Sequence, residues 1–89
     1  MLDQIITAEI ARQLHKEAIR TRGMAVWTVM EDQAAYPGKL VARLATTETT
    51  PYVLLADTIV EMRAALPPGL HYSDCTPADP DGLVELWSS

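Results

Sequence analysis

The chain has 89 residues, of which 48% are hydrophobic and 21% are charged, and its formal net charge at pH 7 is −5. This length supports one hydrophobic core and hence one domain, and the apolar fraction excludes general disorder. The acidic balance argues against nucleic-acid binding, because neutralisation of phosphates supplies most of that affinity. A lone cysteine, Cys75, and the lack of a leader-like or membrane-spanning apolar run predict a cytoplasmic protein with no membrane partner.

The first 23 residues predict an amphipathic helix over residues 3–21. Its apolar stripe recurs at four-residue spacing and consists of Leu2, Ile6, Ile10, Leu14 and Ala18. Asp3 suits the positive end of such a helix, and Gly23 supplies the left-handed residue that commonly follows the last turn. We therefore divide the single domain, residues 1–89, into this helix (1–23) and a sheet-plus-helix body (24–89).

The body begins with two predicted strands. Residues 24–30 are rich in Val, Trp and Thr, and residues 39–46 alternate between apolar and polar side chains. Pro37-Gly38 marks a turn between them. In the second strand Leu40, Ala42 and Leu44 share one face, so we expect that face to be buried and the other to be mostly wet.

After a polar loop, residues 52–55 predict a short third strand. Asp57 is the expected N-cap of a helix that runs through Leu66, where Pro67-Pro68-Gly69 stops it. The remaining ranges are an optional extended segment (70–74), a turn-rich loop (76–82) and a last strand (83–87).

In that last strand we expect Val84 and Leu86 on one face and Glu85 on the other, where it could pair with Arg43. The predicted order is α-β-β-(β)-α-(β)-β. This order favours an α+β fold, a small two-layer sandwich in which two helices cover one face of a mostly antiparallel sheet of three to five strands.

Charge is distributed unevenly along the chain. Residues 1–23 carry a net charge of +1 and the rest carries −6, with no Lys or Arg after Arg63. The functional interpretation gives two docking surfaces and an exposed tryptophan, with the candidates Arg12, Lys16, Arg20, Asp79, Asp81, Glu85 and Trp87. The structural alternative is that the basic strip Arg12–Lys16–Arg20 is solvated or neutralised by the acidic C-terminal third, and that Trp87 folds over the sheet edge.

Catalytic and ligand motifs are absent from the sequence. There is no glycine-rich phosphate loop, and His71 and Cys75 lie in a proline-bounded segment where their spacing does not build a metal site. We therefore predict no cofactor and no metal, and an enzyme is disfavoured. An alternative remains a small enzyme or ligand-binding domain with a site at a dimer cleft holding His71, Asp74 or Cys75.

Residues 25–66, a hairpin followed by a strand that enters a helix through Ala56-Asp57-Thr58, resemble the β-β-β-α unit of HicB-like antitoxins. The resemblance spans under half of the chain and lacks that family's glycine-rich motif. It implies an antitoxin-type module as one alternative.

The leading prediction is a non-enzymatic interaction or regulatory protein that acts through its surface. An inhibitor of a basic or nucleic-acid-binding partner is one version of it, and homodimerisation is a further expectation. A weaker option is nucleic-acid binding through the N-terminal basic residues.

Overall fold

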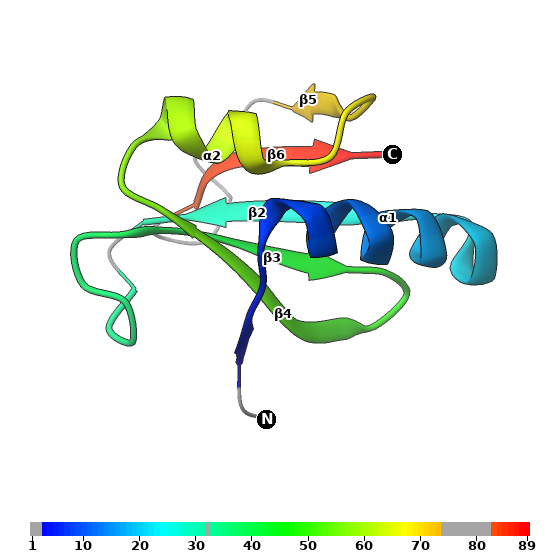
Figure 1. The fold of residues 1–89 in the computed structure, drawn as a ribbon, viewed down its shortest axis with the longest axis horizontal. Coiled ribbons are helices and arrows are strands. Elements are labelled where there is room, and N and C mark those ends of the chain that lie inside the picture. The colour runs from blue at the N-terminus through cyan, green and yellow to red at the C-terminus, as the bar shows by residue number, and fades with distance from the viewer. Residues whose placement is uncertain (1–2, 32, 74–82) are drawn as a thin grey trace.

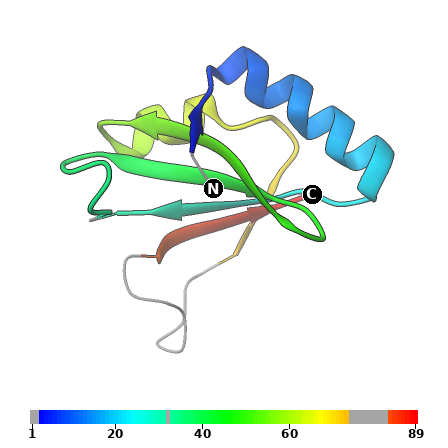
Figure 2. The same cartoon turned by 90° about the horizontal axis from the view of Figure 1, so that it is seen from below.

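The computed structural model of the protein describes residues 3–31, 33–73 and 83–89. The elements are β1 (Gln4–Ile5), α1 (Ala8–Arg22), β2 (Val26–Met30), β3 (Leu40–Ala45), β4 (Thr49–Ala56), α2 (Ile59–Ala65), β5 (His71–Ser73) and β6 (Leu83–Ser88). The strands form one sheet in the order β1-β4-β3-β2-β6-β5, and both helices lie on the same side of it (Figures 1 and 2). The predicted two-layer α+β sandwich is confirmed, with six described strands in place of three to five.

Most neighbouring strands are antiparallel, as predicted; the exception is β1, which runs parallel to β4. Trp27 at the centre of β2 is paired with Leu44 of β3 and with Trp87 of β6. All three side chains therefore belong to the face that the helices cover. The two edge strands, β1 and β5, are only two and three residues long, and β1 pairs with only Tyr52 and Val53 of β4.

The core fills the space between the helices and this face of the sheet. Its buried side chains include Ala11 and Ala18 of α1, Met62 of α2, and Trp27 and Leu54 of the sheet. The two alanines bring α1 close to the strands, because a small side chain lets the helix backbone approach. The apolar stripe of α1 is therefore narrower than its leucines and isoleucines suggest: Ile10 and Ile19 remain exposed at its flanks.

The opposite face of the sheet is less wet than predicted. Leu40, Ala42 and Leu44 point to the core as expected. Val41, on the other face, is nevertheless only 3% exposed. On that face Arg43 forms an ion pair with Asp3 at 2.8 Å, and the hydroxyl of Tyr36 donates to the same carboxylate at 3.0 Å. The residues that precede β1 and β3 thus cover part of this face.

The start of the first helix differs from the prediction. Thr7, in extended conformation, is the N-cap, and its hydroxyl accepts the Ile10 N–H at 3.2 Å. Asp3 cannot cap α1, because its carboxylate binds Arg43 and Tyr36 and the backbone after it pairs with β4. The predicted end is confirmed: Gly23 has φ 75° and its N–H donates to the Ile19 carbonyl.

Loss of this cap has a measurable consequence. We expect Thr7→Ala to lower the free energy of unfolding by about 1 kcal/mol, because one N–H of the first turn loses its acceptor. Thr7→Ser keeps the hydroxyl and is the matched control. Urea unfolding followed by circular dichroism gives both values, and equal stability of the two variants would contradict the assignment of Thr7 as the cap.

The third strand and the second helix also shift. β4 begins at Thr49 and includes Pro51, which the β1 pairing does not reach, so its missing N–H is tolerated at that position. Thr58, not Asp57, caps α2: its hydroxyl accepts the Glu61 N–H at 3.1 Å. Asp57 instead forms an ion pair with Lys39.

The last strand contains an irregularity that the alternation rule does not anticipate. The pairing of β2 with β6 changes register between Val29 and Met30. Val29 is paired with Glu85 and Met30 with Leu83, so the regular alternation of faces is interrupted at Val84. Val84 packs against the core cluster, and Glu85 is buried beneath α2. The predicted Arg43–Glu85 pair is wrong, because β2 separates their two strands.

Candidate binding groove between the helices

A cavity of about 460 Å³ lies between α1, α2 and the C-terminal strand. Arg12 of α1 and Arg63 of α2 line it, together with Ala64, the connection over residues 66–70 and Trp87 of β6. We call this cavity the helix groove. The lining residues are two arginines, mostly apolar residues of the connection and one tryptophan. A groove of this size and mixed lining matches the general character of ligand and partner sites.

The wall formed by α2 is fixed by a buried network. Glu85 is only 2% exposed. The Nε of Arg63 donates to its two carboxylate oxygens at 3.2 and 3.1 Å, and Nη2 donates as well. The indole Nε1 of Trp87 donates to the same carboxylate at 3.0 Å. One carboxylate thus orients both a cation and an aromatic ring that face the groove.

Hydrogen bonds from Arg63, and then from Trp87, hold the pKa of the Glu85 carboxyl below its ordinary value in spite of burial. The same hydrogen bonding raises the pKa of the Arg63 guanidinium, which therefore stays cationic throughout the physiological range. Tyr72 of β5 supports the Trp87 ring, with the two ring centroids 5.1 Å apart and tilted by 58°.

The opposite wall of the groove is formed by α1 and contains Arg12. Arg12 is exposed, and within the described part of the chain it makes no hydrogen bond or ion pair. Arg63 uses Nε and Nη2 for Glu85, which leaves its other amino group available. Arginine presents a planar fork of donors that suits carboxylate and phosphate oxygens. The groove can therefore receive an anion.

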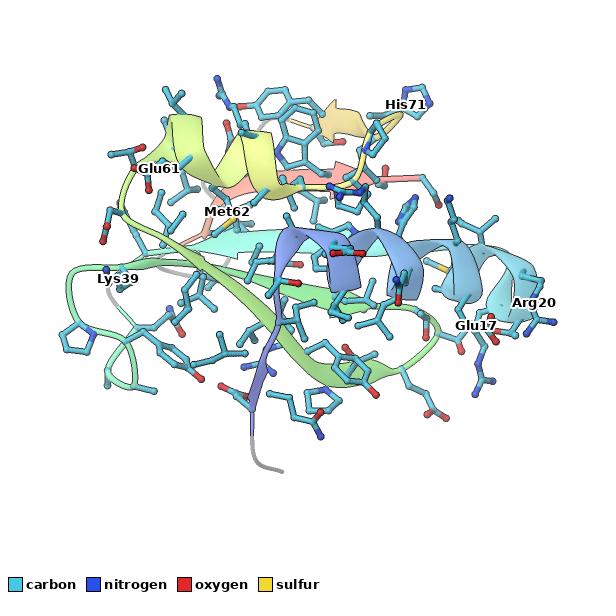
Figure 3. All side chains as sticks on the ribbon, in the orientation of Figure 1. Glu17, Arg20, Lys39, Glu61, Met62 and His71 are labelled. Carbon is cyan, nitrogen blue, oxygen red and sulfur yellow. The ribbon has the colours of Figure 1, made fainter. Side chains whose placement is uncertain are left out.

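The residues of the predicted docking surfaces separate into three groups. Arg12, Glu85 and Trp87 come together at the groove, although Glu85 is buried and acts on Arg63 and Trp87 rather than on a partner. Lys16 is exposed one turn further along α1, and Arg20 forms an ion pair with Glu17 at the far end of the helix (Figure 3). Asp79 and Asp81 lie outside the described residues, so neutralisation of the strip by that segment stays a prediction.

Sequence reasoning missed Arg63 and residues 66–70. In the sequence Arg63 stands out only as the last positive charge of the chain, and the Pro-Pro-Gly run indicates only the end of a helix. The spacing of 22 positions between Arg63 and Glu85 carries no local signal. The available signal was the isolated Glu85 between apolar strand residues, since a carboxylate in such a place requires a cationic partner.

A second buried polar contact lies beneath α1. Trp27 is fully buried, and its indole Nε1 donates to Nδ1 of His15 at 3.4 Å. Burial lowers the pKa of His15 below 6.5. The neutral imidazole is required here, because a protonated ring has no nitrogen left to accept the indole proton.

Stability should therefore depend on pH near neutrality. The unfolded chain protonates His15 more readily than the folded chain does, so the free energy of unfolding falls as the pH drops through the unfolded value of about 6.5. We expect His15→Gln to weaken this dependence between about pH 7.5 and about pH 5.5. The control His71→Gln removes an exposed histidine of β5, and should leave the dependence as in the wild type. Thermal unfolding at several pH values checks this, and identical profiles for His15→Gln and the wild type would refute it.

The alternative site around His71 is not tested by the described residues. His71 is exposed on the edge strand β5, where Figure 3 places it at the margin of the sheet, and Asp74 and Cys75 lie outside the described ranges. Among residues 3–31, 33–73 and 83–89, no three acidic, His or Cys side chains are grouped so that they could hold a metal ion. In the same ranges no helix has the length and apolar character to cross a membrane.

Comparison with protein-family models, with curated proteins and with solved structures found no significant match to this chain. The succession β2-β3-β4-α2 agrees with the β-β-β-α order that the resemblance to HicB-like antitoxins implied. Without a family match the antitoxin-type function stays a prediction, and any functional argument rests on the groove itself.

Proposed function

We propose that this protein is a small non-enzymatic interaction protein, regulatory in role, that binds an acidic segment of a partner protein along α1 and the helix groove. The observation that carries the proposal is the pair of guanidinium groups, Arg12 and Arg63, which face one cavity from two different helices. Trp87 adds an aromatic surface to the same cavity, and arginine and tryptophan are the residue types that most often dominate binding energy at interfaces.

The exposed cations support an acidic partner. Arg12 and Lys16 are exposed and make no ion pair within the described ranges, so an approaching carboxylate meets no competing internal partner. Glu85, by contrast, is withdrawn into the core. Of the acids predicted to contact a basic partner, Glu85 is buried, and Asp79 and Asp81 lie outside the described residues. The acidic partner is therefore the version that the described residues favour.

The test begins with affinity capture of partners from the native host, followed by binding of the purified partner. We expect one partner whose retention falls as salt rises, because the contact is between opposite charges. Arg12→Gln and Lys16→Gln should each weaken binding by about five- to tenfold. Light scattering of the protein alone is done first, since a homodimer through the same groove would compete with the partner.

Arg20→Gln is the matched control, because it removes the same charge from the same helix. Arg20 is already paired with Glu17 and lies away from α2 (Figure 3), so binding should stay within about twofold of the wild type. Equal binding by all three variants and the wild type would reject α1 as the docking surface. Loss of binding in Arg20→Gln alone would also reject it.

A further inference from the structure

The helix groove contains the parts of a small-ligand site, independently of any protein partner. Arg12 stands on one wall without an internal partner in the described chain, and the guanidinium of Arg63 stands on the other. Between them the surface is apolar, made by Leu66, Pro67, Leu70 and the indole of Trp87. One molecule can therefore form an ion pair with the arginines on the two walls and pack its apolar part against the surface between them.

The rigidity of the site supports this inference. The carboxylate of Glu85 holds Arg63 by two donors and Trp87 by its indole N–H. Met62, fully buried on the inner side of α2, fixes the helix that carries Arg63 (Figure 3). A site whose groups are already oriented loses less entropy when a ligand binds than a site that must be ordered.

The charges of the lining residues indicate what kind of ligand fits the groove. Glu85 balances Arg63, so Arg12 supplies the net positive charge of the groove, and none of the described lining residues is acidic. A single anionic group is the best match, because it meets one uncompensated guanidinium and one spare amino group. The indole and the proline-leucine surface suit a flat or apolar body attached to that group.

We infer that the helix groove binds a small organic anion, in which a carboxylate or a phosphate group is attached to a planar apolar body. The anionic group lies between Arg12 and Arg63, and the apolar body lies against Trp87 and Leu70. This inference deepens the proposed function, because it names the chemistry that the same groove recognises; Lys16 does not line the groove and is used by the protein partner alone. Probes that vary the anionic group and the apolar body separately test each half of this recognition.

The test is a titration of the whole ¹⁵N-labelled chain followed by nuclear magnetic resonance. The protein has two tryptophans, so its spectrum contains two indole N–H signals, which Trp87→Phe assigns. The probes are benzoate, phenyl phosphate, inorganic phosphate and neutral benzyl alcohol. Benzoate or phenyl phosphate should shift the Trp87 signal in a saturable way and leave that of Trp27 in place. Inorganic phosphate lacks the apolar body and benzyl alcohol lacks the charge, so each should bind at least about tenfold more weakly.

Arg12→Gln should weaken binding of the anionic probe by about tenfold or more, because it removes a charged hydrogen-bond donor. Lys16→Gln carries the same change in net charge one turn away, and should bind within about twofold of the wild type. Arg12 makes no hydrogen bond or ion pair in the described chain, so its variant is expected to keep the wild-type spectrum elsewhere.

Equal affinity of Arg12→Gln and the wild type would overturn the inference, and so would equal binding of benzyl alcohol and benzoate. Absence of any saturable shift of the Trp87 signal would also overturn it. The inference shares Arg12 with the proposed partner binding, and Lys16→Gln tells the two apart, because it should weaken binding of the protein partner and leave binding of the small anion unchanged. Either one can fail while the other stands.

Discussion

Replacement of Met62 by alanine is expected to lower the free energy of unfolding by about 2 to 4 kcal/mol. Met62 is fully buried and lies in the same core cluster as Trp27 and Leu54. Its removal leaves a cavity between α2 and the sheet, and α2 is only seven residues long. So short a helix has little stability of its own and depends on this packing.

Val60→Ala is the matched control on the same helix. Val60 is 73% exposed, so its truncation removes little buried apolar surface. It should change the free energy of unfolding by no more than about 0.5 kcal/mol. Urea unfolding of both variants, followed by tryptophan fluorescence, makes the comparison. Met62→Ala should also weaken ligand binding in the helix groove, because it loosens the helix that carries Arg63. A Met62→Ala variant as stable as Val60→Ala would show that α2 is not held to the sheet in this way.

Replacement of Glu85 by alanine is expected to lower the free energy of unfolding by about 2 to 3 kcal/mol. The indole N–H of Trp87 loses its acceptor, and the space of a buried carboxylate is left empty. The loss is smaller than the full cost of an orphaned buried charge, because the side chain of Arg63 is half exposed and can be hydrated.

Glu85→Gln separates shape from charge. It keeps an acceptor for Trp87 and the volume of the side chain, so it should be the more stable of the two variants. In the wild type the lowered pKa of Glu85 contributes stability above the unfolded value, and this contribution is lost as the pH falls through the folded value. Glu85→Gln should therefore show less loss of stability in acid than the wild type. A variant with the wild-type acid profile would contradict the role of this carboxylate.

Local signals account for most of the fold. The Gly23 end of α1, the alternation in β3 and the stop at Pro67 could all be predicted, because each depends on a few neighbouring residues. The start of α1 could not, since Asp3 satisfies the rules for a helix terminus yet is bound by Arg43, forty positions later in the chain. The same holds for β1, whose two residues become a strand only through pairing with β4.

The groove itself could not be predicted from the sequence, although two of its lining residues were named as docking candidates. Arg12 and Trp87 were candidates because of their residue type, and the sequence could not place them on one cavity. Their proximity depends on where α2 and β6 lie relative to α1, which no spacing along the chain encodes. Glu85 looked like a surface acid because the face of Val84 and Leu86 was expected to be the buried one. In the structure Glu85 is paired with the buried Val29 and lies with Trp87 on the face that the helices cover.

The central claim is that Arg12, together with the wall formed by Arg63 and Trp87, binds the acidic groups of a partner. The most direct measurement is the dissociation constant of the purified partner complex at several salt concentrations, for the wild type, Arg12→Gln and Arg20→Gln. The claim predicts that Arg12→Gln binds about five- to tenfold more weakly and with a shallower salt dependence, while Arg20→Gln follows the wild type. Superimposable curves for Arg12→Gln and the wild type would contradict it.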